Sequence, residues 1–214
     1  MLYDDTGSES NPLPPQALRA LRRHRPTLCQ LTGSFEYATE YARDLLRGRH
    51  HDGSYLCHTI RYGVAEDLLR SGWTASHFRT LANSGLELLS AGDLLRCWKA
   101  TADQEIPATG DSTGRKEFCE QPNEPLFPPV TYRNADPSRL VVLWDLDDNL
   151  SLSHLWLACP KRLDSIWKPV EAYWVLQVPH PANWIEPTQD FRETGDLKFG
   201  LDKLGTDDPD GEPN

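Results

Sequence analysis

The chain lacks a hydrophobic run long enough to cross a membrane. No apolar stretch approaches the roughly 20 residues that a spanning helix needs. The first residues, MLYDDTGSES, are acidic and polar, unlike the basic and then apolar start of a secretory signal. We therefore expect a cytoplasmic protein whose 214 residues form one ordinary domain or a small pair of domains.

Closely spaced cysteines are also missing. The five cysteines are an odd number, the nearest two are 22 residues apart, and none forms a CxxC pair. A structural zinc site usually contains such a pair, and a cytoplasm keeps thiols reduced. The sequence therefore predicts free thiols at every one of these positions: Cys29, Cys57, Cys97, Cys119 and Cys159.

Negative charge is present in excess but is spread unevenly. The net charge is −10, yet residues 15–100 hold twelve Lys and Arg against eight Asp and Glu. Residues 101–214 hold ten basic against twenty-one acidic side chains. Such an asymmetry is typical of a basic surface for nucleic acid in one half, or of an acidic interaction surface in the other. The alternative is that ordinary solvated faces differ by chance, because an excess of four positive charges over residues 15–100 is modest.

The segment 15–100 is predicted to form about five short helices. Its apolar residues recur at spacings of three and four, which places them on one face of a helix. Candidate first or capping residues stand at Pro15, Ser34, Ser54, Thr74 or Ser76, and Ser90. Asp93, three residues after Ser90, completes an acidic form of the capping box and predicts a last helix through Trp98.

The remainder is predicted to be a proline-rich connection followed by a small antiparallel sheet of three or more strands. Residues 101–137 contain six prolines and no sustained period. Three apolar or alternating stretches occur in residues 138–186, near 140–144, 150–158 and 170–178. Their short connections suit an antiparallel meander.

Both ends of the chain are predicted to be disordered, namely residues 1–14 and the acidic tail 187–214. The fold class is therefore α+β. The helical and β parts can form one domain if the helices pack on the sheet.

The stretch VVLWDLDDNL, residues 141–150, contains two aspartates after an apolar run. It resembles the first motif of the haloacid-dehalogenase-like phosphatases, in which a strand ends in an Asp-x-Asp signature. The resemblance implies a catalytic role for Asp145 as the nucleophile, for Asp147 as the general acid and base, and Mg²⁺ as the cofactor. The alternative is that residues 147–149 are the polar tip of a hairpin, where Asp and Asn bond to the local backbone.

A group of potential metal ligands occurs at residues 50–58, HHDGSYLCH. His50, His51 and His58 are the candidate zinc ligands, since neutral imidazole binds zinc well. Cys57 and His58 are adjacent on a predicted helix and point about 100° apart, so they do not easily share one site. A solvated loop next to one packed thiol is the alternative, and no cofactor is then expected.

The segment LLRSGWTASHFRTLANSG, residues 68–85, has the pattern of a helix-turn-helix with Gly72 in its turn. Exposed polar residues on the second helix, with neighbouring arginines, would contact bases and phosphates. The candidate nucleic-acid-binding residues are Arg61, Arg70, Ser76, His77, Arg79 and Arg96. An ordinary helical hairpin is the alternative.

Aromatic residues are concentrated in the acidic C-terminal half. A surplus of them on one sheet face would form an amphipathic surface for a partner. The candidate partner-binding residues are Trp156, Trp167, Tyr173 and Trp184. From this surface we expect a non-enzymatic partner-binding protein, a regulator or inhibitor, whose unknown protein partner is basic. The alternatives are a DNA- or RNA-binding regulator that uses the basic segment 61–96, and a magnesium-dependent phosphatase-like enzyme.

Overall fold

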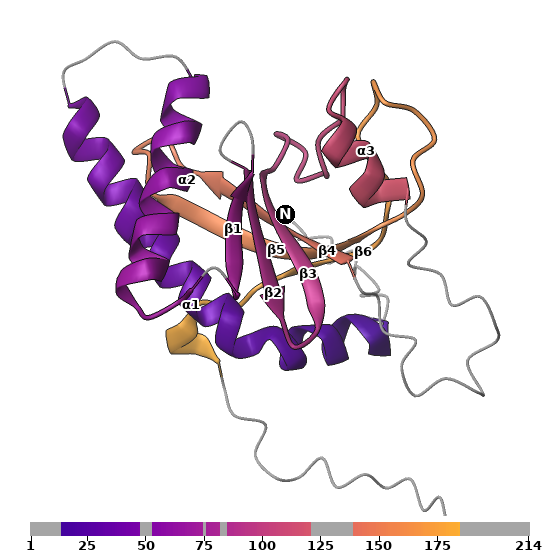
Figure 1. The fold of residues 1–214 in the computed structure, drawn as a ribbon, viewed down its shortest axis with the longest axis horizontal. Helices are drawn as coiled ribbons and strands as arrows, with labels where there is room; N and C mark the ends of the chain where they lie inside the picture. The colour runs from indigo at the N-terminus through magenta and orange to yellow at the C-terminus, as the bar shows by residue number, and fades with distance from the viewer. Residues whose placement is uncertain (1–13, 48–52, 75, 82–84, 121–138, 185–214) are drawn as a thin grey trace, which may run out of the picture. The chain divides into compact units, whose positions relative to one another are not determined.

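The computed structural model describes residues 14–47, 53–74, 76–81, 85–120 and 139–184. The chain divides into two units, residues 1–182 and 183–214, and the second contributes only residues 183–184 to the described part. The predicted disordered ends, apart from Pro14, lie outside the described residues. The described part is α+β, as predicted, and combines three α-helices with a six-stranded mixed sheet (Figure 1).

Two long helices, α1 (Pro15–Leu46) and α2 (Gly53–Arg70), pack side by side (Figure 1). They approach closely where Gly63 of α2 meets Ala38 of α1, because a Cβ added at Gly63 would lie 2.9 Å from the Ala38 Cβ. Glycine is therefore needed at position 63 for the helices to pack at this distance.

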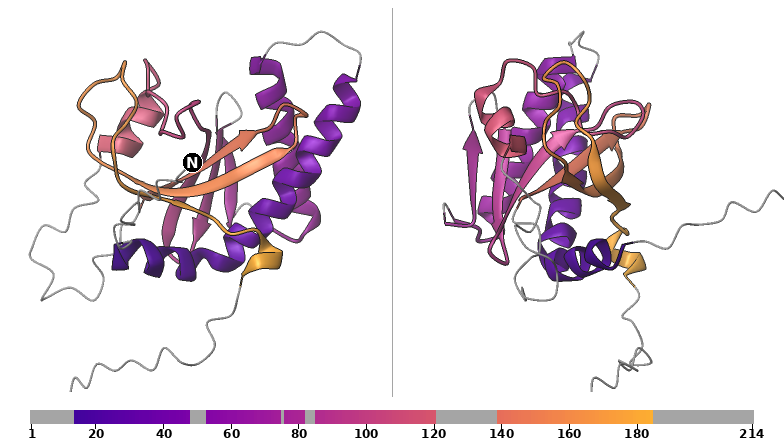
Figure 2. Two further views of the ribbon diagram at one scale, coloured as in Figure 1. Left: turned by 180° about the vertical axis from the view of Figure 1, so that it is seen from behind. Right: turned by 90° about the vertical axis from the view of Figure 1, so that its right-hand side faces the viewer.

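The predicted first two helices are one continuous helix, α1, which contains Pro26. Proline removes one backbone hydrogen bond and commonly kinks a helix, and Figure 2 shows that α1 changes direction along its length. Ser34 is not a helix cap. Its Oγ donates a 2.7 Å hydrogen bond to Oδ2 of Asp67 on α2, so this position joins the two helices.

The predicted fourth and fifth helices are wrong, because this segment forms three strands. They are β1 (Phe78–Leu81), β2 (Gly85–Ser90) and β3 (Asp93–Lys99), in antiparallel order. Ser90 and Asp93 are a pair across a two-residue hairpin turn, not a capping box. Ala91 and Gly92 have φ of 49° and 89°, the left-handed geometry that joins two tightly twisted strands.

The sheet continues through the three predicted strands of the C-terminal half. These are β4 (Arg139–Leu146), β5 (Leu152–Pro160) and β6 (Ala172–Gln177), and they pair antiparallel as predicted. The sheet is mixed and not purely antiparallel, because β3 and β4 are parallel neighbours. The chain between them, predicted as a connection only, contains helix α3 (Thr113–Glu120). A short 3-10 helix follows β6 at Pro181–Asn183.

The sheet has two sides, and each carries a buried layer. The α1 side contacts the long helices, as Phe35 of α1 and Trp144 of β4 show with ring centroids 5.4 Å apart. On the α3 side, the ring of Phe118 from α3 packs 5.8 Å from that of Trp98. The same buried cluster on the α3 side includes Val141, Leu143, Trp156 and Ala158. Within the described residues, no helix is both long and apolar enough to cross a membrane.

Candidate functional site

Asp145 and Asp147 lie where the chain reverses direction between β4 and β5. Asp145 pairs with His154 across two antiparallel strands, so the backbone doubles back as in the hairpin interpretation. Oδ1 of Asp147 accepts backbone N–H groups from Asn149 at 2.9 Å and from Ser151 at 2.8 Å. Asp147 therefore stabilises its own turn. After this turn the chain returns directly as the antiparallel strand β5, without the helical crossover to a parallel strand that the phosphatase resemblance implies.

The described residues expected to form the second helix of the helix-turn-helix form a turn and strand β1 instead. Ser76 and His77 are exposed in a turn before β1, where the Nδ1 of His77 lies 3.0 Å from the hydroxyl of Thr74. Arg70, at the end of α2, bonds to the hydroxyl of Tyr37, and this bond is the main reason that its pKa is raised. The sequence pattern therefore grouped residues that the fold distributes over a helix, a turn and two strands.

Arg79 and Arg96 hold one buried carboxylate between them. Nε of Arg79 lies 2.6 Å from Oε1 of Glu87, and Nε of Arg96 lies 2.6 Å from Oε2. Burial raises the pKa of Glu87, but the hydrogen bonds from the two arginines outweigh this effect and keep the pKa below its usual value. The Glu87 side chain is only 3% exposed and that of Arg96 only 12%, so this pair belongs to the structure of the sheet.

Arg96 and Arg139 attach α3 to the sheet. The Arg96 guanidinium stacks over the Phe118 ring at 4.6 Å and bonds to the carbonyl of Gly114. Arg139 stacks at 5.4 Å from the same ring and donates to the carbonyl of Glu117. Such bonds satisfy carbonyl groups of a short helix and add cation–π attraction.

Arg61, the remaining predicted arginine, is half-buried on α2. Its Nε donates to the carbonyl of Cys57 at 3.1 Å. Burial lowers its pKa. The pKa of Arg115, whose guanidinium lies 5.2 Å from the Trp98 ring, is lowered by burial and also by repulsion from Arg61. Arg61 and Arg96 both repel Arg115 of α3, so positive charge is concentrated around this helix.

The candidate zinc ligands are only partly described. His50 and His51 lie outside the described residues, and His58 is exposed on α2. Within the described ranges, no group of three or more His, Cys, Asp or Glu side chains is placed to hold a metal ion.

All five cysteines are free. Burial raises the pKa of Cys119 to about 11 and that of Cys159 to about 12, and it raises the pKa of Cys97 as well. Because the thiolate is the reactive form, these three thiols are poor nucleophiles and poor metal ligands.

The predicted partner-binding aromatics are not all alike. Trp156 of β5 is buried, whereas Trp167 is 70% exposed and Tyr173 of β6 is 41% exposed. Trp184 is half-buried and belongs to the second unit of the chain. Trp156 lines a cleft whose described lining does not include the other three residues.

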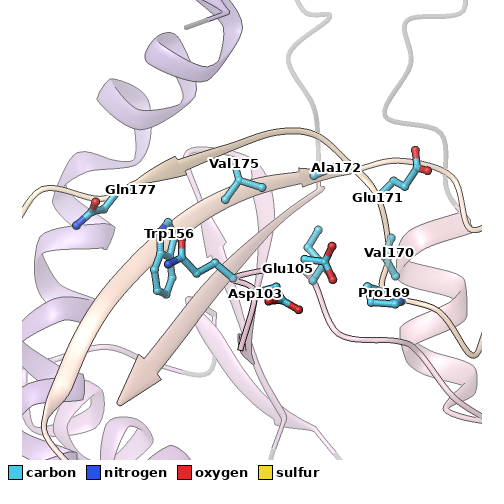
Figure 3. A pocket seen from close by; sticks show the side chains of 11 residues that line it. Asp103, Glu105, Trp156, Pro169, Val170, Glu171, Ala172, Val175 and Gln177 are labelled. Carbon is cyan, nitrogen blue, oxygen red and sulfur yellow. The ribbon is translucent and has the colours of Figure 1, made fainter. Parts of the chain in front are cut away.

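That cleft has a volume of about 600 Å³ and opens on the α3 side of the sheet, over β5 and β6 (Figure 3). Trp156 and Val175 come from the strands, and the loop after β3 contributes Asp103 and Glu105. Its described lining includes a third acidic residue, Glu171, but no Lys or Arg. The size lies within the range typical of ligand pockets, and its charge favours a cation.

The acidic wall of the cleft is a well-defined turn, residues 101–105. The N–H of Gln104 donates to the Thr101 carbonyl at 3.0 Å, and the N–H of Glu105 donates to the Thr101 hydroxyl at 3.0 Å. Gln104 has a φ of 61°, an uncommon conformation for a residue other than glycine and one that often accompanies function. Ile106, which follows this turn, forms a β-bridge with Val170: the N–H of Val170 donates to the Ile106 carbonyl at 2.9 Å.

The carboxylates of the cleft differ in how they are compensated. Glu171 forms an ion pair with Lys161 at 3.0 Å. Asp103 and Glu105 are exposed and form no ion pair within the described part of the chain. Two negative charges that are unpaired within the described residues therefore lie in the same cleft as the apolar residues Trp156, Val170 and Val175, of which Val175 is the most exposed at 39%.

A second polar cluster, which was not predicted from the sequence, joins α1 to the β2–β3 hairpin. The ring of His24 is fully buried, with Nδ1 2.9 Å from Oγ of Ser90 and Nε2 3.1 Å from Oδ2 of Asp93. These residue types are those of a catalytic triad. However, Ser90 is buried, also bonds to Thr27 at 2.7 Å, and does not line the cleft. The cluster therefore fixes the hairpin on α1.

Sequence reasoning missed the cleft for an identifiable reason. Its acidic wall follows β3, which was predicted as a helix, and lies in the segment predicted as a connection. The informative signal was the polar and acidic stretch TADQE, residues 101–105, directly after an apolar segment. Comparison with known proteins gives no match, whether to protein families, to curated proteins or to solved structures.

Proposed function

We propose that this protein acts by binding a partner protein and that the acidic cleft receives a basic segment of that partner. The observation that carries the proposal is the cleft itself, with uncompensated Asp103 and Glu105 beside Trp156. An ammonium or guanidinium group would meet the carboxylates, and its aliphatic stem would cover the apolar floor.

The expected affinity is moderate and sensitive to salt. Asp103 and Glu105 are exposed, and exposed ion pairs contribute at most about 1 kcal/mol each. The net charge of −10 also attracts a basic partner over a distance and raises the association rate. Binding through such charges weakens as the ionic strength rises.

The experiment that tests the proposal measures binding of a fluorescent hepta-lysine peptide to two double variants. Asp103→Asn with Glu105→Gln removes two charges from the cleft. Asp148→Asn with Glu120→Gln removes two exposed charges elsewhere and is the matched control. We expect the cleft variant to lose at least about fivefold in affinity, as two ion pairs of about 0.5 kcal/mol each imply, and the control to lose less than twofold. An equal loss in both variants would show that only net charge matters.

Nucleic-acid binding is a second candidate, supported by two exposed arginines of the basic segment 61–96. Arg79 is 66% exposed at its side chain and Arg70 is also exposed, so both are accessible to phosphate. If this candidate is correct, retention on a nucleic-acid column falls steeply with salt, because phosphate contacts release counterions. Retention that survives Arg70→Glu with Arg79→Glu would contradict it.

A further inference from the structure

The outer edge of β6 differs from that of β1 at the opposite end of the sheet. Both are terminal strands. β1 has four residues and includes the charged Arg79. The six residues of β6, AYWVLQ, include neither a charge nor a proline. Natural sheets usually protect their edges with such features, so β6 is an unprotected template for another strand.

The backbone of β6 presents hydrogen-bonding groups on that edge. The N–H of Val178 donates to the carbonyl of Leu155 in β5 at 2.8 Å. The backbone N–H and C=O groups of successive residues in a strand point to opposite edges. The backbone groups of Leu176 therefore also face β5, while those of Val175 and Gln177 face outward. No described strand pairs with β6 there.

The same two residues line the acidic cleft with their side chains. Figure 3 shows Val175 and Gln177 on β6 beside Trp156. A strand added to this edge would therefore direct every second side chain toward the cleft.

We infer that the partner segment is an extended peptide with basic residues at alternate positions, which joins the sheet as a seventh strand along β6. This inference rests on the proposed function. The backbone contacts would supply the register, and the lysine or arginine side chains would meet Asp103 and Glu105 at the cleft.

Charge argues for a basic partner and against two other occupants. A second copy of this chain carries a net charge of −10 and the same acidic cleft, so two copies would bring like charges together. The chain's own residues 187–214 hold eight acidic against three basic side chains and are repelled for the same reason.

The test uses the full chain and a synthetic peptide of four Lys-Val repeats. Two further peptides carry N-methyl groups on two central lysines or on two central valines. In a strand, only alternate N–H groups face the neighbour, so one methylated peptide should lose about tenfold or more in affinity. The other should bind within about twofold of the parent.

The sensitive peptide also reports the strand direction. The lysine side chains lie on the cleft side, as do those of Val175 and Gln177. In antiparallel pairing these lysines exchange hydrogen bonds with Val175 and Gln177, so methylation of the lysine N–H groups blocks binding. In parallel pairing the valines beside them make these bonds, so methylation of the valine N–H groups blocks binding. If the two methylated peptides bind with equal affinity, whether or not it is lower than that of the parent peptide, the inference of a seventh strand is refuted. If hepta-lysine binds and the Lys-Val peptide does not, the inference of a seventh strand is refuted and the proposed function stands. If neither peptide binds, the proposed function fails with it.

Discussion

Replacement of Glu87 by Gln tests whether Arg79 and Arg96 are parts of the structure. The Arg79 side chain is 66% exposed, so loss of its ion pair should cost at most about 1 kcal/mol. Arg96 is only 12% exposed, and removing one partner of a buried pair costs about 3–5 kcal/mol. Glutamine can still accept one hydrogen bond, and Arg96 keeps its bond to Gly114. We therefore expect Glu87→Gln to lower the free energy of unfolding by about 3 kcal/mol at pH 7.

The pH dependence of this loss has a definite sign. The folded-state pKa of Glu87 is depressed, so its contribution is fully present above the unfolded-state pKa, near 4.3. The contribution is lost as the pH falls through the folded-state value. The difference between the wild type and Glu87→Gln should therefore be largest near neutral pH and should shrink below about pH 4.

Urea unfolding, followed by tryptophan fluorescence at pH 7 and pH 3.5, measures both effects. Arg79→Gln is the control and should lose no more than about 1 kcal/mol at pH 7. Equal unfolding midpoints for the wild type and Glu87→Gln at pH 7 would refute the reasoning. So would a difference between them that grows as the pH falls.

Three further predictions concern the rest of the fold. Gly63→Ala should lower the free energy of unfolding by about 1 kcal/mol, because its Cβ would lie 2.9 Å from that of Ala38. Gly33→Ala, whose Cβ meets nothing within 4 Å, should raise it by up to about 1 kcal/mol, and thermal unfolding measures both. Asp147→Ala should cost about 1–2 kcal/mol in urea unfolding, because two backbone N–H groups lose their acceptor, while Asp148→Ala should change stability by less than about 0.5 kcal/mol. A colorimetric thiol reagent should leave the three buried thiols unmodified until the protein unfolds, and rapid reaction of all five would contradict the burial. These three are Cys97, Cys119 and Cys159.

The strands of the C-terminal half could be predicted because their pattern reflects the final burial. In β6, Trp174 and Leu176 are buried and Tyr173 and Val175 are exposed, so burial alternates along the strand as the pattern predicts. The turn at Asp147 was also predictable, since an Asp side chain that bonds to nearby backbone is a local interaction.

The strands of the N-terminal half were mistaken for helices because leucine fits both periods. Leu86, Leu88 and Leu89 occupy β2, where Leu88 is fully buried and Leu89 is 48% exposed. Glu87, between Leu86 and Leu88, is buried with its charge compensated by Arg79 and Arg96, its direct partners on β1 and β3. A helical period groups residues three or four apart, so it does not reveal this pairing between residues eight and nine apart.

The candidate site was predictable only in its chemistry. An acidic, tryptophan-containing surface was expected, and Trp156 lies in the acidic cleft. The wall at residues 101–105 could not be placed beside β5 and β6 from sequence, because this requires the parallel pairing of β3 with β4. Trp167 was expected to act with Trp156 but does not line the cleft.

A titration of the isotope-labelled protein with the Lys-Val peptide, followed by nuclear magnetic resonance, measures most directly where a basic segment binds. We expect the largest shift changes at the backbone amides of Gln104, Val175 and Gln177 and at the Trp156 indole. The amides of Arg79 and Arg96 should remain unchanged. Shift changes centred on the arginines, or spread evenly over the surface, would contradict binding of the peptide along β6 at the acidic cleft.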